Sequence, residues 1–133
     1  ITRSYYRTAA ACLVVYDVTS ARSFENVRRW VQDVRVNARP DVSIVLVANK
    51  CDLSHARVVR SEEGAFLAAS LGATYCEASA KTGEGVADAF LRPLRAAVRA
   101  SVAALDADER LPGRRLVDPK VPEAAEESCC PNN

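Results

Sequence analysis

The apolar run from Val42 to Ala48 constrains the fold of this chain more than any other stretch. It contains Val, Ile, Leu and Ala apart from one serine, and it stops at the polar sequence Asn49-Lys50-Cys51-Asp52. A short run rich in β-branched residues predicts a strand that is buried on both faces, as in a parallel sheet. Polar residues that follow such a strand lie at the carboxyl edge of the sheet, where α/β proteins bind their ligands. We therefore expect a binding loop at residues 49–52.

The side chains of this loop suit guanine. The Asp52 carboxylate can accept the two neighbouring donors of guanine, N1–H and the 2-amino group, while the Asn49 amide can donate to N7 and the Lys50 stem can lie against the purine face. Adenine has an acceptor at N1 and no 2-amino group, so it would leave polar groups unpaired. The alternative for this loop is a capped turn after a strand, without a ligand.

A second polar loop, Glu77-Ala78-Ser79-Ala80-Lys81, follows the short strand predicted at Ala73–Cys76. Together the two loops resemble the base-recognition motifs of Ras-like small GTPases. The resemblance implies that Ser79 braces the second loop, that the Ala80 backbone N–H reaches guanine O6 and that Lys81 covers the base. It also implies GTP and GDP as ligands.

The start of the chain points to one branch of that family. Ile1-Thr2-Arg3-Ser4-Tyr5-Tyr6-Arg7 resembles the Rab signature at the end of the second switch region, although Thr8 and the alanines after it depart from the pattern. The resemblance implies a partner surface at Tyr5, Tyr6 and Arg7. The alternative is a helical turn that packs both tyrosines under the sheet.

Strand and helix patterns alternate along the chain, which predicts an α/β fold with right-handed crossovers and a parallel sheet. The expected strands are Ala11–Asp17, Val42–Ala48 and Ala73–Cys76, and the expected helices cover about 21–37, 61–71 and 84–105. By resemblance this is part of a three-layer P-loop GTPase-like fold. Three strands make an incomplete sheet, so we expect an edge or a face without its partner.

Helix signals support these ranges. The first helix has one apolar face, and Trp30 beside that face is expected to pack rather than to anchor a partner. Ser61 is expected to cap the second helix and Gly72 to end it. Pro93 is expected to kink or restart the last helix near Arg92. The residues of the two apolar sides are Phe24, Val27, Val31 and Val34 in the first helix, and Val86, Phe90, Leu94, Val98 and Val102 in the last.

Hydrolysis of GTP needs residues that these 133 do not contain. Phosphoryl transfer requires a Gly-x-x-x-x-Gly-Lys-[Ser/Thr] phosphate loop, a Mg²⁺ ligand and a residue that positions water. With no methionine in the chain either, we interpret it as the C-terminal part of a small GTPase, lacking the phosphate loop and the first switch. We expect no catalytic residue and no metal ligand here, Mg²⁺ binding only with the missing half, and weak or no nucleotide binding by the chain alone.

Composition changes after the last expected helix, so we predict a GTPase-type domain part at residues 1–105 and a flexible tail at 106–133. The tail ends Ser128-Cys129-Cys130-Pro131-Asn132-Asn133. The adjacent cysteines resemble the doubly prenylated endings of Rab proteins, and two lipids would anchor a tail that has no basic patch. The alternative is a pair of incidental thiols.

A net charge of +1 gives no basic field for nucleic acid, and the five cysteines lack the spacing of a zinc site or a disulfide framework. The expected function is guanine recognition within a Rab-like GTPase in vesicle traffic, lipid-anchored on the cytoplasmic face of an intracellular membrane and cycling with the cytosol. Its partners by resemblance are effectors, an exchange factor, a GTPase-activating protein, an escort protein and a GDP-dissociation inhibitor. The alternatives are a truncated or degenerate Rab-like interaction protein without nucleotide cycling, and an unrelated nucleotide-dependent α/β enzyme.

Overall fold

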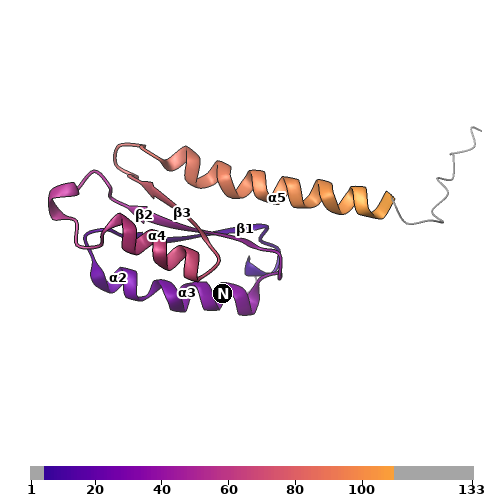
Figure 1. Cartoon of the computed structure of the whole chain (residues 1–133), viewed down its shortest axis with the longest axis horizontal. Coiled ribbons are helices and arrows are strands. Elements are labelled where there is room, and N and C mark those ends of the chain that lie inside the picture. Colours follow the sequence, from indigo (N-terminus) through magenta and orange to yellow (C-terminus); the bar gives the residue numbers. More distant parts are fainter. Residues whose placement is uncertain (1–4, 110–133) are drawn as a thin grey trace, which may run out of the picture.

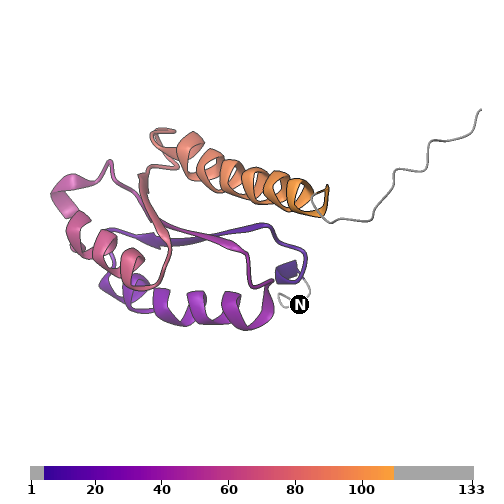
Figure 2. The same ribbon diagram turned by 45° about the vertical axis from the view of Figure 1, so that its right-hand side comes forward.

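Three strands form one parallel sheet in the order β1-β2-β3, with β1 at Ala11–Asp17, β2 at Ser43–Asn49 and β3 at Thr74–Ala78. The computed structural model describes the backbone of residues 5–109 and the side chains as far as Leu105. It confirms the expected α/β class. Helices α2 (Ala21–Glu25), α3 (Val27–Asn37) and α4 (Ser61–Ser70) cover one face of the sheet, and α5 (Val86–Glu109) lies on the other (Figures 1 and 2).

The central strand β2 is buried on both faces, as its continuous apolar sequence predicts. Ile44, Leu46 and Ala48 pack in the larger core, toward α3 and α4. Val45 and Val47 pack in a smaller core that includes Ala89 of α5. Because β2 has a strand on each side and helices above and below, no residue of this strand is exposed.

The register of the sheet aligns the ends of the strands. Asp17, the last residue of β1, pairs with Asn49, the last residue of β2, and Asn49 pairs with Ala78, the last residue of β3. The loops that leave the three strands therefore start from one row of the sheet. This row places the two predicted base loops beside each other.

The helix expected at about 21–37 is divided at Asn26. The Asn26 side chain donates to the Arg22 carbonyl at 2.9 Å, and such local bonds compete with the helical ladder. The predicted apolar face is confirmed, since Val27, Val31 and Val34 are buried. Phe24 packs on Tyr16 with ring centroids 5.0 Å apart.

The cap expected at Ser61 is wrong by one residue. Arg60 is the N-cap of α4, and its backbone N–H donates to the Glu63 carboxylate at 2.9 Å. The Ser61 hydroxyl donates instead to Glu77 Oε1 at 2.6 Å, a partner from another element that no local pattern shows. At the other end of α4, Gly72 has φ +59° and ends the helix as predicted.

Pro93 lies inside α5, which is one helix from Val86 to Glu109, so the predicted restart near Arg92 is wrong. The proline is buried on the same side of the helix as Ala89, one turn earlier, and this side faces the sheet. Packing there offsets the cost of about 3 kcal/mol for an interior proline. The helix also passes the boundary expected at Leu105, because no glycine or proline occurs between Pro93 and Glu109.

Val86 packs against the smaller core, but the large apolar residues that follow it along α5 point away from the sheet. Phe90, Leu94, Val98 and Val102 are 61%, 57%, 53% and 51% exposed, whereas Ala89 is 2% exposed. Small side chains therefore face the sheet and large ones form an exposed apolar stripe, defined by these four residues. No helix in the described part of the chain is long and apolar enough to span a membrane.

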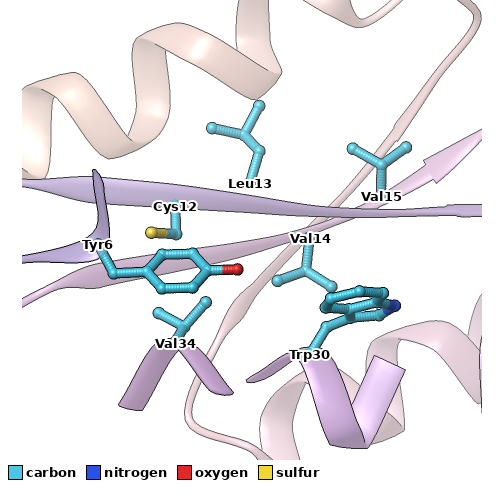
Figure 3. A pocket seen from close by; sticks show the side chains of 7 residues that line it. All are labelled: Tyr6, Cys12, Leu13, Val14, Val15, Trp30 and Val34. Carbon is cyan, nitrogen blue, oxygen red and sulfur yellow. The ribbon is translucent and has the colours of Figure 1, made fainter. Parts of the chain in front are cut away.

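A pocket of about 340 Å³ lies along β1 (Figure 3). Leu13 and Val15 point to the α5 side of the strand, while Cys12 and Val14 point to the side of α3 (Figure 3). Trp30 borders the pocket and is 48% exposed, so it packs only in part. Since both faces of β1 contribute, the pocket lies at the edge of β1 that has no strand beside it in the described residues.

Substituting Leu94 and Val98 with Gln should lower the binding of ANS, a dye that reports exposed apolar surface, because the two residues lie in the exposed stripe. The free energy of unfolding should change by less than about 0.5 kcal/mol. The control is Ala89→Gln, which places an amide in the small core and should cost about 1–3 kcal/mol. Equal destabilisation by the two variants would mean that the stripe is covered.

Candidate functional site

The two predicted base loops line one hollow of about 370 Å³ at the carboxyl edge of the sheet. The residues that line it are Asn49, Lys50, Asp52, Leu53, Ala80 and Lys81. Five of the six residues predicted to bind guanine are thus in its wall. The sixth, Ser79, is fully buried directly behind it.

Three hydrogen bonds join the first loop to the second. Ser79 Oγ donates to Asp52 Oδ1 at 2.6 Å, and the Ala80 N–H donates to Asn49 Oδ1 at 3.1 Å. The Cys51 N–H donates to the Ala78 carbonyl at 3.2 Å. Each loop therefore holds polar groups of the other in place.

Ser79 is the centre of the second loop. Its N–H donates to the Glu84 carbonyl at 2.9 Å, and its carbonyl accepts from the Gly83 N–H at 2.8 Å. Its hydroxyl accepts from the Thr82 N–H at 3.1 Å while donating to Asp52. Every polar group of Ser79 is therefore engaged. The bonds to residues 82–84 close the loop into a tight turn, which holds the hydroxyl toward Asp52.

Lys50 adopts φ +66°, a conformation that L-residues rarely take. Its ammonium pairs with Asp17 Oδ2 at 2.6 Å, so the side chain reaches from the end of β2 to the end of β1. Asp17 Oδ1 accepts from the Thr19 N–H at 2.8 Å and from the Thr19 hydroxyl at 2.7 Å. The carboxylate thus fixes both the turn after β1 and the cation beside the hollow.

Burial acts to raise the pKa of Asp17, but the hydrogen bonds from Lys50 and Thr19 outweigh it and the pKa lies below its usual value. A carboxyl with a lowered pKa stabilises the fold above its unfolded pKa, and this contribution is lost as the pH falls through the lowered value. Asp17 is therefore ionised at neutral pH. No local pattern around Asp17 indicates this pairing, because Asp17 meets Lys50 through the register of β1 with β2.

Two polar atoms of the hollow stay open. Within residues 5–105, Asp52 Oδ2 and the Asn49 amide nitrogen make no hydrogen bond, while Asp52 Oδ1 and Asn49 Oδ1 are engaged. One carboxylate oxygen and one amide donor are thus oriented and available. A planar ligand with a donor for the first and an acceptor for the second matches them.

The other predicted site residues lie elsewhere. Tyr6 packs against the larger core near the start of β1, at the end of the sheet away from the hollow, and Tyr5 is exposed. Of the two tyrosines, only Tyr6 matches the packed alternative. Arg7 is exposed in the turn that follows. Cys129 and Cys130 lie outside the described residues.

Replacing Gly85 with Ala should disrupt the second loop. Gly85 has φ +68°, and an added Cβ would overlap the Glu77 carbonyl oxygen. The matched control is Gly83→Ala, where φ is +85° but no atom lies within 4 Å of the added carbon. Gly83→Ala should lower the free energy of unfolding by about 1–2 kcal/mol, the strain alone. Gly85→Ala should cost about 1–3 kcal/mol more in denaturant unfolding, and equal costs would refute the close contact.

Comparison with known proteins identifies the family of this chain. The family model described as "Ras family" matches residues 1–99. Ras-related protein Rab-37 of Homo sapiens is 47% identical over 91 residues, which are 68% of this chain and 41% of that protein. Ras-related protein Rab-8A of Gallus gallus is 44% identical over 90 residues, covering 68% and 44%. Ras-related protein SEC4 of Candida albicans is 49% identical over 90 residues, covering 68% and 43%.

The chain spans less than half the length of these curated relatives. The family match nevertheless covers most of the chain and includes both base loops and all three strands. The chain belongs to the Ras family of small GTPases and is Rab-like within it.

Proposed function

We propose that residues 49–52 and 79–81 form the guanine-binding part of the nucleotide site of a Rab-like GTPase. Asp52 accepts from N1–H and the 2-amino group, and Asn49 donates to N7. Lys50 and Lys81 cover the base, Ser79 braces Asp52, and the Ala80 N–H reaches O6. The ligands are GTP and GDP, in keeping with the family.

The observation that carries this proposal is the orientation of Asp52. Ser79 engages Oδ1 at 2.6 Å, so the carboxylate cannot turn freely. Oδ2 is open, and Oδ1 keeps a second lone pair for a neighbouring donor. Two adjacent donors on a base satisfy an oriented carboxylate, and a base with an acceptor at that place does not. Discrimination by an unpaired buried polar group is strong, so this arrangement supports guanine over adenine.

Hydrolysis is not assigned to these residues. Phosphoryl transfer depends on a phosphate loop and Mg²⁺, and the 133 residues contain no such loop. We propose that this chain supplies base recognition, and that residues outside it hold the phosphates and the metal ion. Nucleotide binding by the chain alone is then weak, because the phosphates carry most of the ligand's charge.

The Rab likeness further supports a role in vesicle traffic on the cytoplasmic face of an intracellular membrane. We propose a domain part at residues 1–105 and a tail at 106–133, with Cys129 and Cys130 as the lipid attachment sites. The exposed Tyr5 and Arg7, with the partly buried Tyr6 between them, form part of the surface for effectors and exchange factors. A GTPase-activating protein, an escort protein and a GDP-dissociation inhibitor complete the proposed partners.

Titration of the ¹⁵N-labelled chain with GDP should shift the amide resonances of residues 49–53 and 79–82, whereas ADP at equal concentration should not. The comparison cancels the contribution of the phosphates, which the two ligands share. Equal shifts with both ligands would refute guanine recognition. No shift with either ligand would favour the alternative, an interaction protein without nucleotide cycling. Tight binding would contradict the expected dependence on a phosphate loop.

Asp52→Asn should exchange the preferred base. The amide oxygen can still accept from Ser79 Oγ, while the open position becomes a donor. Xanthine has a carbonyl where guanine has its 2-amino group. The affinity of the variant for GDP should therefore fall about tenfold, and its affinity for xanthosine diphosphate should rise about tenfold. The same titration measures both ligands, and an unchanged order of GDP over xanthosine diphosphate would refute the role of Asp52.

A further inference from the structure

A charged network lies behind the candidate site, around Glu77 at the end of β3. Arg57 donates to both carboxylate oxygens of Glu77, Nη1 to Oε1 and Nη2 to Oε2, each at 2.9 Å. Oε1 also accepts from the Ser61 hydroxyl at 2.6 Å and the Tyr75 hydroxyl at 2.8 Å. The side chains of Arg57 and Glu77 are only 18% and 31% exposed. A two-pronged pair of this kind fixes orientation as well as distance.

The network links the segment that follows the first base loop to the strand that precedes the second. Arg57 follows the short 3-10 helix Ser54–Ala56, and so belongs to the segment that leaves Asp52. The next two residues, Val58 and Val59, donate their N–H groups to the Val18 carbonyl at 2.9 and 3.0 Å. Glu77 stands two residues before Ser79. Arg57 and Glu77 therefore connect the segment after the first loop to the strand that delivers the second.

Neither residue touches the hollow. The residues that line it belong to the loops themselves, and Arg57 and Glu77 are not among them. The backbone of Glu77 is constrained as well, since its carbonyl approaches Gly85 so closely that a Cβ there would overlap it. The side chain of Glu77 thus contacts Arg57 and Ser61, which follow the first loop, while its carbonyl approaches Gly85, which follows the second.

We propose that Arg57 and Glu77 are a positioning pair for the guanine site, which sets Ser79 and Ala80 at the correct place relative to Asp52 and Asn49. The inference rests on the proposed function, because it assigns a purpose to the order of a site that is itself proposed. It goes beyond that function by naming two residues that act on the base loops without contacting the base.

Helix capping does not explain the network. The N-terminus of α4 is capped by Glu63, which accepts from the Arg60 N–H. The Ser61 hydroxyl is thereby left for Glu77. Nor does stability alone require charge here, because replacing a partly buried ion pair with apolar residues is often neutral. What the charged pair adds is a set of directional hydrogen bonds between the segment after the first loop and the strand before the second.

The charge states suit this role. Burial acts to raise the pKa of Glu77, but hydrogen bonds from Arg57, Ser61 and Tyr75 outweigh it and lower the pKa. Burial and the bond to Glu77 raise the pKa of Tyr75, so its hydroxyl remains a donor. At neutral pH the network is thus one carboxylate surrounded by three donor side chains.

The test is amide hydrogen exchange of the full chain without nucleotide, comparing wild type with Glu77→Gln. Gln keeps the shape of the side chain and loses the charge. Exchange of the Ala80 and Cys51 N–H groups, which bond across the loops, should accelerate about tenfold, as expected for weakening a bond to a charged group. Exchange at Leu46 in the middle of the sheet should change less than about twofold.

Asp41→Asn is the matched control. Arg39 donates to both oxygens of Asp41, from Nε at 3.0 Å and from Nη2 at 2.8 Å, so this pair is two-pronged as well. It lies in the turn before β2, at the opposite end of the sheet, and is exposed. Its loss should leave exchange at Ala80 and Cys51 unchanged.

Acceleration at Leu46 equal to that at Ala80 would overturn the proposal, because the pair would then stabilise the whole fold without selecting the loops. Unchanged exchange at Ala80 and Cys51 would overturn it too. If Glu77→Gln does not fold, Arg57→Lys keeps the charge and loses the second prong, and the same criteria apply. If neither variant folds, Arg57 and Glu77 are needed for folding itself, and the proposal of a positioning role is overturned.

Nucleotide titration supplies a second reading that separates this inference from the proposed function. If wild type binds GDP, Glu77→Gln should weaken the binding of GDP more than that of 6-thioguanosine diphosphate, which keeps N1–H and the 2-amino group but has sulfur, a weaker acceptor, in place of the O6 that Ala80 recognises. Equal weakening of the two ligands would count against positioning of Ala80. If wild type binds neither, the proposed function fails while the exchange result still decides whether the pair orders the loops.

Discussion

The register of the parallel sheet is the constraint on which the candidate site depends. Asp17, Asn49 and Ala78 stand in one row because β1, β2 and β3 pair without offset at their carboxyl ends. A slip of one residue would turn every side chain of a strand to the other face. Burial of β2 on both faces makes such a slip costly, since Leu46 and Val47 would exchange cores of different size. The loops are thus positioned by packing that lies well away from them.

The two faces of the sheet are packed in different ways. The face toward α3 and α4 has a broad core of valine, leucine and tyrosine, whereas α5 approaches the other face through Ala89 and the buried Pro93. Small side chains let the helix backbone come near the strands. The same rotation of α5 leaves Phe90 and Leu94 in solvent. A stripe with helical spacing therefore does not by itself identify the buried side of a helix.

Much of this architecture follows from local sequence. The strands, the parallel order and the meeting of the two polar loops come from apolar runs and the residues that end them. What escaped prediction depends on partners from distant elements. Ser61 is bonded to Glu77 where a cap was expected, and Pro93 is tolerated because the sheet packs against it. Lys50 meets Asp17 only because of the strand register. The proposed pairing of Arg57 with Glu77 has no local signature, because the two residues are 20 positions apart in different elements.

The hydrogen bond between the Ala80 N–H and Asn49 Oδ1 has a consequence for any base that enters the hollow. This donor is already satisfied within the protein, and the Lys50 ammonium is paired with Asp17. A base that uses the Ala80 N–H must therefore take this donor from Asn49 Oδ1, even though Asp52 Oδ2 and the Asn49 amide nitrogen are open to it. Such an exchange yields little net free energy, as when folding replaces bonds to water. On the proposed function, these loops govern which base is accepted, and the tightness of binding must come from contacts to the rest of the nucleotide.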